Sequence, residues 1–173
     1  LHGLCQAVQI ALHHLGLPHH SRNLEDYKKA EALLLEMRKN VRYFHSSKYV
    51  GDLANADICV AVGFSGDILQ ASNRAIEANN GVKIDYVIPK EGAPIWFDMA
   101  AMPVDTTNEE AAYTFLNYLL EPEVMAKVSN YVQYANAIPT ADPLVDPKIR
   151  QDGRIYPPEE SMSGLYALEA MPL

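Results

Sequence analysis

The 173-residue sequence predicts an α/β fold, and three observations support this class. Up to about residue 102, segments with apolar residues at helical spacing alternate with short runs that are typical of strands. The run 58–62 is apolar throughout, as in a strand that is buried on both faces of a parallel sheet. After residue 107 the helical spacing dominates. We therefore expect mixed sheets flanked by helices, followed by a mostly helical part.

The first predicted elements are two helices and the loop between them. Residues 6–16 carry apolar side chains at helical spacing and end at a glycine. Asn23 is a typical capping residue and predicts a helix that continues to about residue 39. Residues 41–44 are expected to form a short strand, and a short helix is expected to end near Ala56.

The middle of the sequence is expected to contain most of the sheet. The run 58–62 is the first of these strands, and Cys59 within it is expected to be a small buried core residue. A Gly-rich turn over 63–66 leads into a helix from Asp67 to about residue 79. Two further strands are predicted at 83–88 and 95–102, with a turn over 89–94.

The last third of the sequence is predicted to be mostly helical. Thr107 and Glu110 have the spacing of a capping box for a helix over 109–120. A second helix is predicted over 123–131, and the proline-rich stretch 138–152 is expected to be irregular. Pro and Glu residues over 157–160 are typical of a first turn and predict a last helix there.

Composition and charge disfavour several classes of partner. The 14 basic and 22 acidic side chains give a net charge of −8, which disfavours nucleic acids and anionic membranes as partners. No apolar stretch approaches the roughly 20 residues that span a bilayer. The first residues show no secretion signal, and we expect the chain to begin inside a domain. The two cysteines define no disulfide framework.

Aromatic rings beside carboxylates are the main functional signal of the sequence. Phe64 precedes Asp67 at a predicted strand–turn–helix junction, and Trp96 precedes Asp98 on a predicted strand. Because side chains alternate along a strand, Trp96 and Asp98 are expected to share one face. Tyr134 adds a further ring. Aromatic faces attract an organic ammonium group and carboxylates accept its N–H bonds, so the pattern predicts a binding site for an organic cation.

Two other interpretations have weaker support. The segment 63–67 has the start of a nucleophile elbow, but Asp67 stands where that motif requires glycine. Asp67 and Asp98 could instead form a glycosidase pair, although nothing distinguishes an acid from a base. The histidine pairs 13–14 and 19–20 could bind zinc or copper, but adjacent histidines on a helix diverge by about 100°. Binding without catalysis, cofactor or metal is therefore the preferred interpretation.

Many short motifs of the sequence occur in the order found in polyamine-binding proteins. The motifs lie at 43–47, 52–55, 57–61, 66–67, 70–74, 88–93, 97–98, 117–120 and 134–136. Over roughly residues 22–170 the chain resembles the periplasmic putrescine/spermidine-binding subunits of bacterial ABC importers. The resemblance implies a type II periplasmic-binding-protein fold with two lobes, a polyamine ligand and a membrane permease as partner. It implies a C-terminal part of such a protein, with residues 1–85 in the second lobe and 86–173 in the first.

The resemblance also assigns roles to the five residues singled out above. It implies that Phe64, where the family usually has Trp, is a stacking wall, and that Asp67 binds an ammonium group. Trp96 and Asp98 match a second aromatic–carboxylate pair, and Tyr134 matches a ring that lines the ligand cleft. The large ring of Trp96 favours spermidine over putrescine. Residues 1–6 depart from the family, which usually has a ligand-binding acid there.

Overall fold

The computed structural model describes residues 2–168, which divide into two compact units. Unit 1 comprises Leu1–Tyr49, Ile88–Trp96 and Glu159–Leu173, and unit 2 comprises Val50–Val87 and Phe97–Pro158. Each unit is therefore assembled from separate segments of the chain. The predicted change of lobe after residue 85 lies close to the passage between units at 87–88. The assignment of residues 1–85 and 86–173 to particular lobes stays a prediction.

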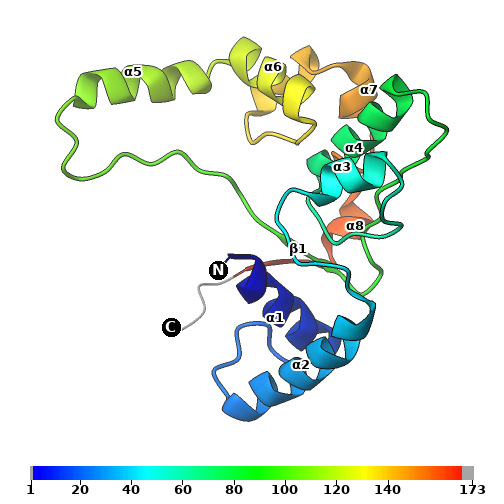
Figure 1. Cartoon of the computed structure of the whole chain (residues 1–173). Helices are drawn as coiled ribbons and strands as arrows, with labels where there is room; N and C mark the ends of the chain where they lie inside the picture. Colours follow the sequence, from blue (N-terminus) through cyan, green and yellow to red (C-terminus); the bar gives the residue numbers. More distant parts are fainter. Residues whose placement is uncertain (1, 169–173) are drawn as a thin grey trace. The chain divides into compact units, whose positions relative to one another are not determined.

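The core of unit 1 is a pair of helices, α1 (His2–His14) and α2 (Leu24–Met37), shown in blue in Figure 1. Leu12 and Ala30 are completely buried between them, with Val8, Tyr27 and Leu33 packed around. As predicted, Asn23 caps α2, and its Oδ1 accepts the backbone N–H of Glu25 at 3.0 Å. A 3₁₀ turn, η1 (Arg38–Asn40), extends the second helix.

Unit 1 also contains the sheet of the described residues, which has two parallel strands. Strand β1 (Ala93–Ile95) pairs with β2 (Leu165–Ala167), with Ala93 opposite Leu165. The short helix α8 (Glu159–Met162) precedes β2 and confirms the helix predicted there. Gly92 has φ +102° directly before β1, and an added Cβ would collide with the carbonyl oxygen of Gly164. Glycine is therefore required for the close approach of these two segments.

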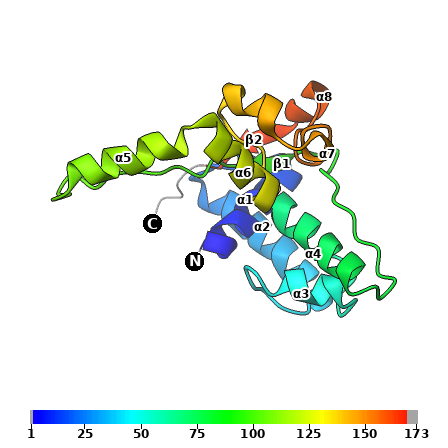
Figure 2. The ribbon, with the colours of Figure 1, turned by 90° about the horizontal axis from the view of Figure 1, so that it is seen from above.

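Unit 2 is built from short helices. They are α3 (Tyr49–Ala54), α4 (Ser65–Glu77), α5 (Glu109–Leu119), α6 (Pro122–Val132), η2 (Pro139–Leu144) and α7 (Pro147–Arg150). Both views place α3 beside α4 (Figures 1 and 2). The amide of Asn80 donates to the carbonyl oxygen of Ala54 at 2.8 Å, which connects the ends of these two helices.

The packing of unit 2 centres on α6 and on one face of α4. Ala126, Ala141 and Val145 are buried together between α6, η2 and the start of α7. Helix α4 buries its apolar stripe, which includes Ile68 and Leu69. The stretch 138–152, expected to be irregular, is in fact largely helical, since it forms η2 and α7.

The predicted strands are the main correction. Residues 41–44, 58–62 and 83–88 have no strand pairing, and the strand predicted at 95–102 is limited to the end of β1. Val60 and Val62 are 84% and 83% exposed, and Cys59 is exposed instead of buried. A strand needs a hydrogen-bonded neighbour, and the described residues provide none beside these runs.

The predicted capping box of α5 is also wrong. Asn108 is the N-cap residue, and its Oδ1 accepts the backbone N–H of Ala111 at 3.4 Å. Asn is at least as good a cap as Thr, and the helix itself begins at Glu109, as predicted.

Candidate functional site

The candidate site of unit 2 begins at the N-terminus of α4. Phe64 is the N-cap residue with extended φ and ψ of −80° and 141°, and its side chain cannot accept a capping hydrogen bond. Asp67 lies in the first turn, where the free N–H groups and the helix dipole favour a negative charge. Phe64 and Asp67 are both half-buried. The sequence therefore places a ring and a carboxylate together at one helix end.

Tyr134 reaches this helix end from the loop after α6. Gln133 terminates α6 in the left-handed region, with φ 59° and ψ 41°, and thereby reverses the direction of the chain. The ring of Tyr134 then lies directly against Gly66. A Cβ built on Gly66 would be 2.6 Å from Cζ and 2.8 Å from Cδ2 of Tyr134, so no side chain fits there.

The electrostatics of Tyr134 place two carboxylates near its phenol. Burial, together with the negative charges of Asp67 and Asp98, raises the pKa of Tyr134 to about 12. The backbone N–H groups of Asp67 and Gly66 act in the opposite direction, because they stabilise the phenolate. Three of the five residues singled out from the sequence, Asp67, Asp98 and Tyr134, therefore interact within unit 2.

Asp98 comes from a segment without regular structure. Residues 96–102 form no strand, so the strand predicted to carry Trp96 and Asp98 is wrong, and their shared face stays a prediction. Asp98 is exposed, and its neighbours Phe97 and Met99 are 67% and 87% exposed. Trp96 is the last residue of the unit 1 segment Ile88–Trp96 and is 39% exposed.

Two features of this site were not predicted from the sequence. One is the requirement for glycine at position 66, which depends on contact with a residue far along the chain. The other is the polar network around Asn136, in which the Asn136 amide donates to the buried hydroxyl oxygen of Ser129 at 3.0 Å. The motif 134–136 contains both Tyr134 and Asn136, but only the structure shows that Tyr134 contacts Gly66 while Asn136 bonds to Ser129.

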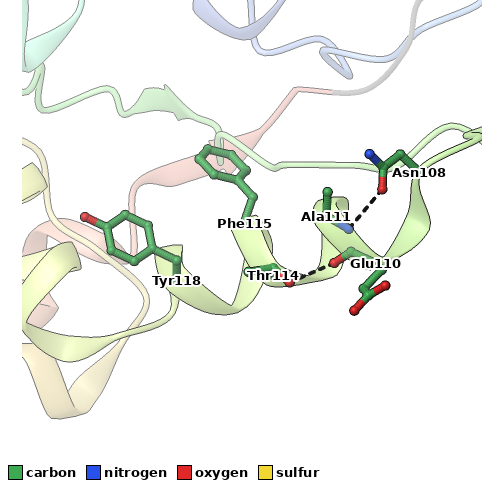
Figure 3. Close-up of a pocket in the computed structure, with 6 residues that line it drawn as sticks. All are labelled: Asn108, Glu110, Ala111, Thr114, Phe115 and Tyr118. Atoms are coloured by element: carbon green, nitrogen blue, oxygen red, sulfur yellow. Dashed lines mark hydrogen bonds between the residues drawn. The ribbon is translucent and has the colours of Figure 1, made fainter.

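Among the hollows of unit 2, two lie apart from this group. The larger, about 580 Å³, is an open face along the single helix α5 and includes Phe115 and Tyr118 (Figure 3). None of the five predicted binding residues lines it. The smaller, about 200 Å³, lies along α4 and includes Gln133, whose Oε1 is buried without a partner. Gln133 thus connects this hollow to the loop that carries Tyr134.

Histidines gather in unit 1 around Tyr166. The ring of His13 stacks on Tyr166 with centroids 4.2 Å apart, and His19 lies 4.7 Å from the same ring. The ring N–H at Nε2 of His13 donates to the carbonyl oxygen of Glu91 at 2.7 Å. Across residues 2–168, no three His, Cys, Asp or Glu side chains are arranged to hold a metal ion. The stacking and the hydrogen bond give these rings a structural role.

The described part of the chain also contains no helix that is long and apolar enough to cross a membrane.

Comparison with known proteins gives one consistent family. The family described as bacterial extracellular solute-binding protein matches residues 2–159. The chain is 52% identical over 159 residues to the putrescine-binding periplasmic protein PotF of Escherichia coli K12, covering 91% of this chain and 43% of PotF. It is 51% identical over 167 residues to the putrescine-binding periplasmic protein SpuD of Pseudomonas aeruginosa, covering 96% and 46%.

A solved structure shows the same fold. The chain aligns with the spermidine/putrescine ABC transporter substrate-binding protein PotD of Streptococcus pneumoniae at a TM-score of 0.75 and 27% identity, over 98% of this chain and 51% of that one. This similarity confirms the predicted fold class, a partial two-lobe type II binding-protein fold. The chain spans about half the length of the relatives that it matches. Since the family match covers most of the sequence, the chain belongs to the bacterial extracellular solute-binding proteins.

Proposed function

We propose that this chain supplies part of a polyamine site in a solute-binding subunit of an ABC importer. The observation that supports the proposal is that the charges of Asp67 and Asp98 both act on the Tyr134 phenol and raise its pKa. Two carboxylates provide the charge and the acceptor oxygens that ammonium groups require. Phe64 at the head of α4 and Trp96 are proposed as aromatic walls, which attract cations and pack against methylene groups.

Putrescine is the proposed ligand. Two relatives with 52% and 51% identity are named putrescine-binding proteins, whereas the spermidine/putrescine-binding protein of E. coli is 30% identical. The similarity therefore favours putrescine over the spermidine that the size of Trp96 suggested. A diamine has an ammonium group at each end, which matches the number of carboxylates that interact with Tyr134.

The proposed role is capture and delivery, not catalysis. The relatives are named periplasmic binding proteins, so we propose a periplasmic location and a membrane permease as partner. The net charge of −8 fits a cationic ligand and opposes nucleic acid as a partner. The proposed function requires no cofactor and no direct insertion into the membrane.

Calorimetric titration of the protein with putrescine, spermidine and spermine tests the proposal. We expect putrescine to bind, and Asp98→Asn to weaken binding by about 10- to 100-fold, because a charge-assisted hydrogen bond is lost. Asp105→Asn is the matched control. Asp105 is exposed on the same irregular segment, and its substitution removes the same charge. Equal effects of the two substitutions, or an unchanged affinity in Asp98→Asn, would contradict the assignment of Asp98.

A further inference from the structure

We propose that Asn136 is a positioning residue, which holds Tyr134 against the N-terminus of α4. This inference rests on the proposed function, because Tyr134 is placed in the polyamine site there. Asn136 itself lies two residues further along the loop and is assigned no contact with the ligand. Its role is to fix the loop that carries the Tyr134 ring.

The side chain of Asn136 uses both of its polar atoms within unit 2. Its amide nitrogen donates to Ser129 Oγ at 3.0 Å and to the Tyr156 hydroxyl oxygen at 3.4 Å. Its Oδ1 accepts the backbone N–H of Ile138 at 2.8 Å. Ser129 is only 1% exposed, so the first of these bonds is protected from water. One amide thus connects α6, the loop and the segment after α7.

The partner Tyr156 is itself held in place. The guanidinium of Arg150 lies 4.5 Å from the centre of the Tyr156 ring, in a cation–π contact. Arg150 also forms an ion pair with Asp142 at 2.9 Å. The hydrogen bonds of Asn136 are therefore anchored on α6 by Ser129 and on α7 through Tyr156 and Arg150.

On the side that faces α4, the position of the Tyr134 ring is limited by Gly66. The Tyr134 ring occupies the space that a side chain at position 66 would need, so the ring cannot move closer to α4. Gln133 fixes the start of the loop, since its backbone N–H donates to the carbonyl oxygen of Ser129 at 2.9 Å. With the start, the end and one face of the loop fixed, the phenol has one position relative to Asp67. Binding sites depend on this kind of support, because a looser ring loses contact with its partners.

The test measures the ionisation of Tyr134 and the binding of putrescine in the same variants. Protein labelled with ¹³C at tyrosine Cζ is titrated with alkali, and the Tyr134 signal is assigned by its loss in Tyr134→Phe. In Asn136→Ala we expect the pKa of Tyr134 to fall from about 12 towards the ordinary 10.0, because the phenol leaves its half-buried place beside the carboxylates. We expect the affinity for putrescine to fall about tenfold.

Asn130→Ala is the matched control. Asn130 also lies on α6 and uses its Oδ1 to accept a backbone N–H, that of Asp146 at 2.9 Å, but it has no bond to the Tyr134 loop. We expect this variant to keep the wild-type Tyr134 titration and affinity. If Asn136→Ala does not fold, Ser129→Ala removes an acceptor of the same amide and should change both readouts in the same direction.

The outcomes separate this inference from the proposed function. An unchanged Tyr134 titration in folded Asn136→Ala, or in folded Ser129→Ala, would overturn the positioning role. An equal change in Asn130→Ala would overturn it as well. If the unsubstituted protein binds no putrescine, the proposed function fails, while the titration still decides whether Asn136 positions Tyr134.

Discussion

At the scale of single residues, Gly66 determines how closely Tyr134 can approach α4. Gly66 lies inside the first turn of a helix, where alanine is usually favoured by up to about 1 kcal/mol. Here the Tyr134 ring occupies the place of the missing Cβ, so the ordinary preference is reversed. The glycine therefore serves the contact with Tyr134, since the helix itself gains nothing from it.

We predict that Gly66→Ala destabilises the protein by about 1–3 kcal/mol, the usual cost of inserting an atom into a packed place. Denaturant unfolding measures this change, and calorimetry should show weaker putrescine binding because the ring is displaced. Gly51→Ala is the control, since Gly51 lies within α3 with no atom within 4 Å of an added Cβ. If Gly66→Ala is as stable as the unsubstituted protein and binds putrescine with unchanged affinity, position 66 does not restrict the place of the Tyr134 ring.

At the scale of elements, local signals in the sequence predicted the helices well. Asn23 caps α2 through its own side chain, and the predicted helices near 67–79, 109–120 and 123–131 correspond to α4, α5 and α6. A helix forms its backbone hydrogen bonds with itself, so its pattern and caps are visible within a short stretch.

Strands and the site geometry could be predicted only in part, because both depend on distant partners. The run 58–62 has the composition of a buried strand, yet no described segment pairs with it. Strand β2, by contrast, forms at 165–167 because β1 lies beside it. In the same way, residue type alone singles out Asp67, Asp98 and Tyr134 as candidates, but the contact between Gly66 and Tyr134 requires the fold.

Arg154 connects two elements of unit 2 that are distant in sequence. Its guanidinium lies 2.6 Å from Asp152 and 2.8 Å from Asp85, which belongs to the segment after α4. Its hydrogen bonds hold the pKa of Asp152 and of Asp85 below the ordinary 3.8. A carboxyl group with a lowered pKa in the folded state stabilises the fold above pH 3.8 and loses that contribution as the pH falls further.

We predict that Arg154→Met lowers the free energy of unfolding near neutral pH and that this difference shrinks as the pH falls below 3.8. The effect should be modest, because the side chain of Asp85 is 72% exposed and solvent screens the pair. Urea unfolding over a pH series measures it. Arg74→Met, an exposed position on α4, controls for the loss of a positive charge. A difference that stays constant with pH would contradict the assignment.

At the scale of the whole molecule, several of the most exposed apolar residues lie on segments that the sequence predicted to be strands. Val60, Val62, Val87 and Met99 are all more than 70% exposed, with values of 84%, 83%, 74% and 87%. Such runs are usually paired and covered in a folded protein, and unpaired ones favour association between chains. The chain matches only 43% and 46% of the length of PotF and SpuD.

The exposure of Val62 leads to a prediction that distinguishes an exposed run 58–62 from one that is packed in solution. In this chain Val62→Lys should change the free energy of unfolding by less than about 0.5 kcal/mol, because an exposed position loses no packing. Val145→Lys makes the same change at a residue that is 4% exposed and should be severely destabilising, since it buries an unpaired charge. Denaturant unfolding of both variants gives the comparison, and light scattering should show less association in Val62→Lys. If Val62→Lys costs as much as Val145→Lys, the run 58–62 is packed in solution, as the sequence pattern predicted.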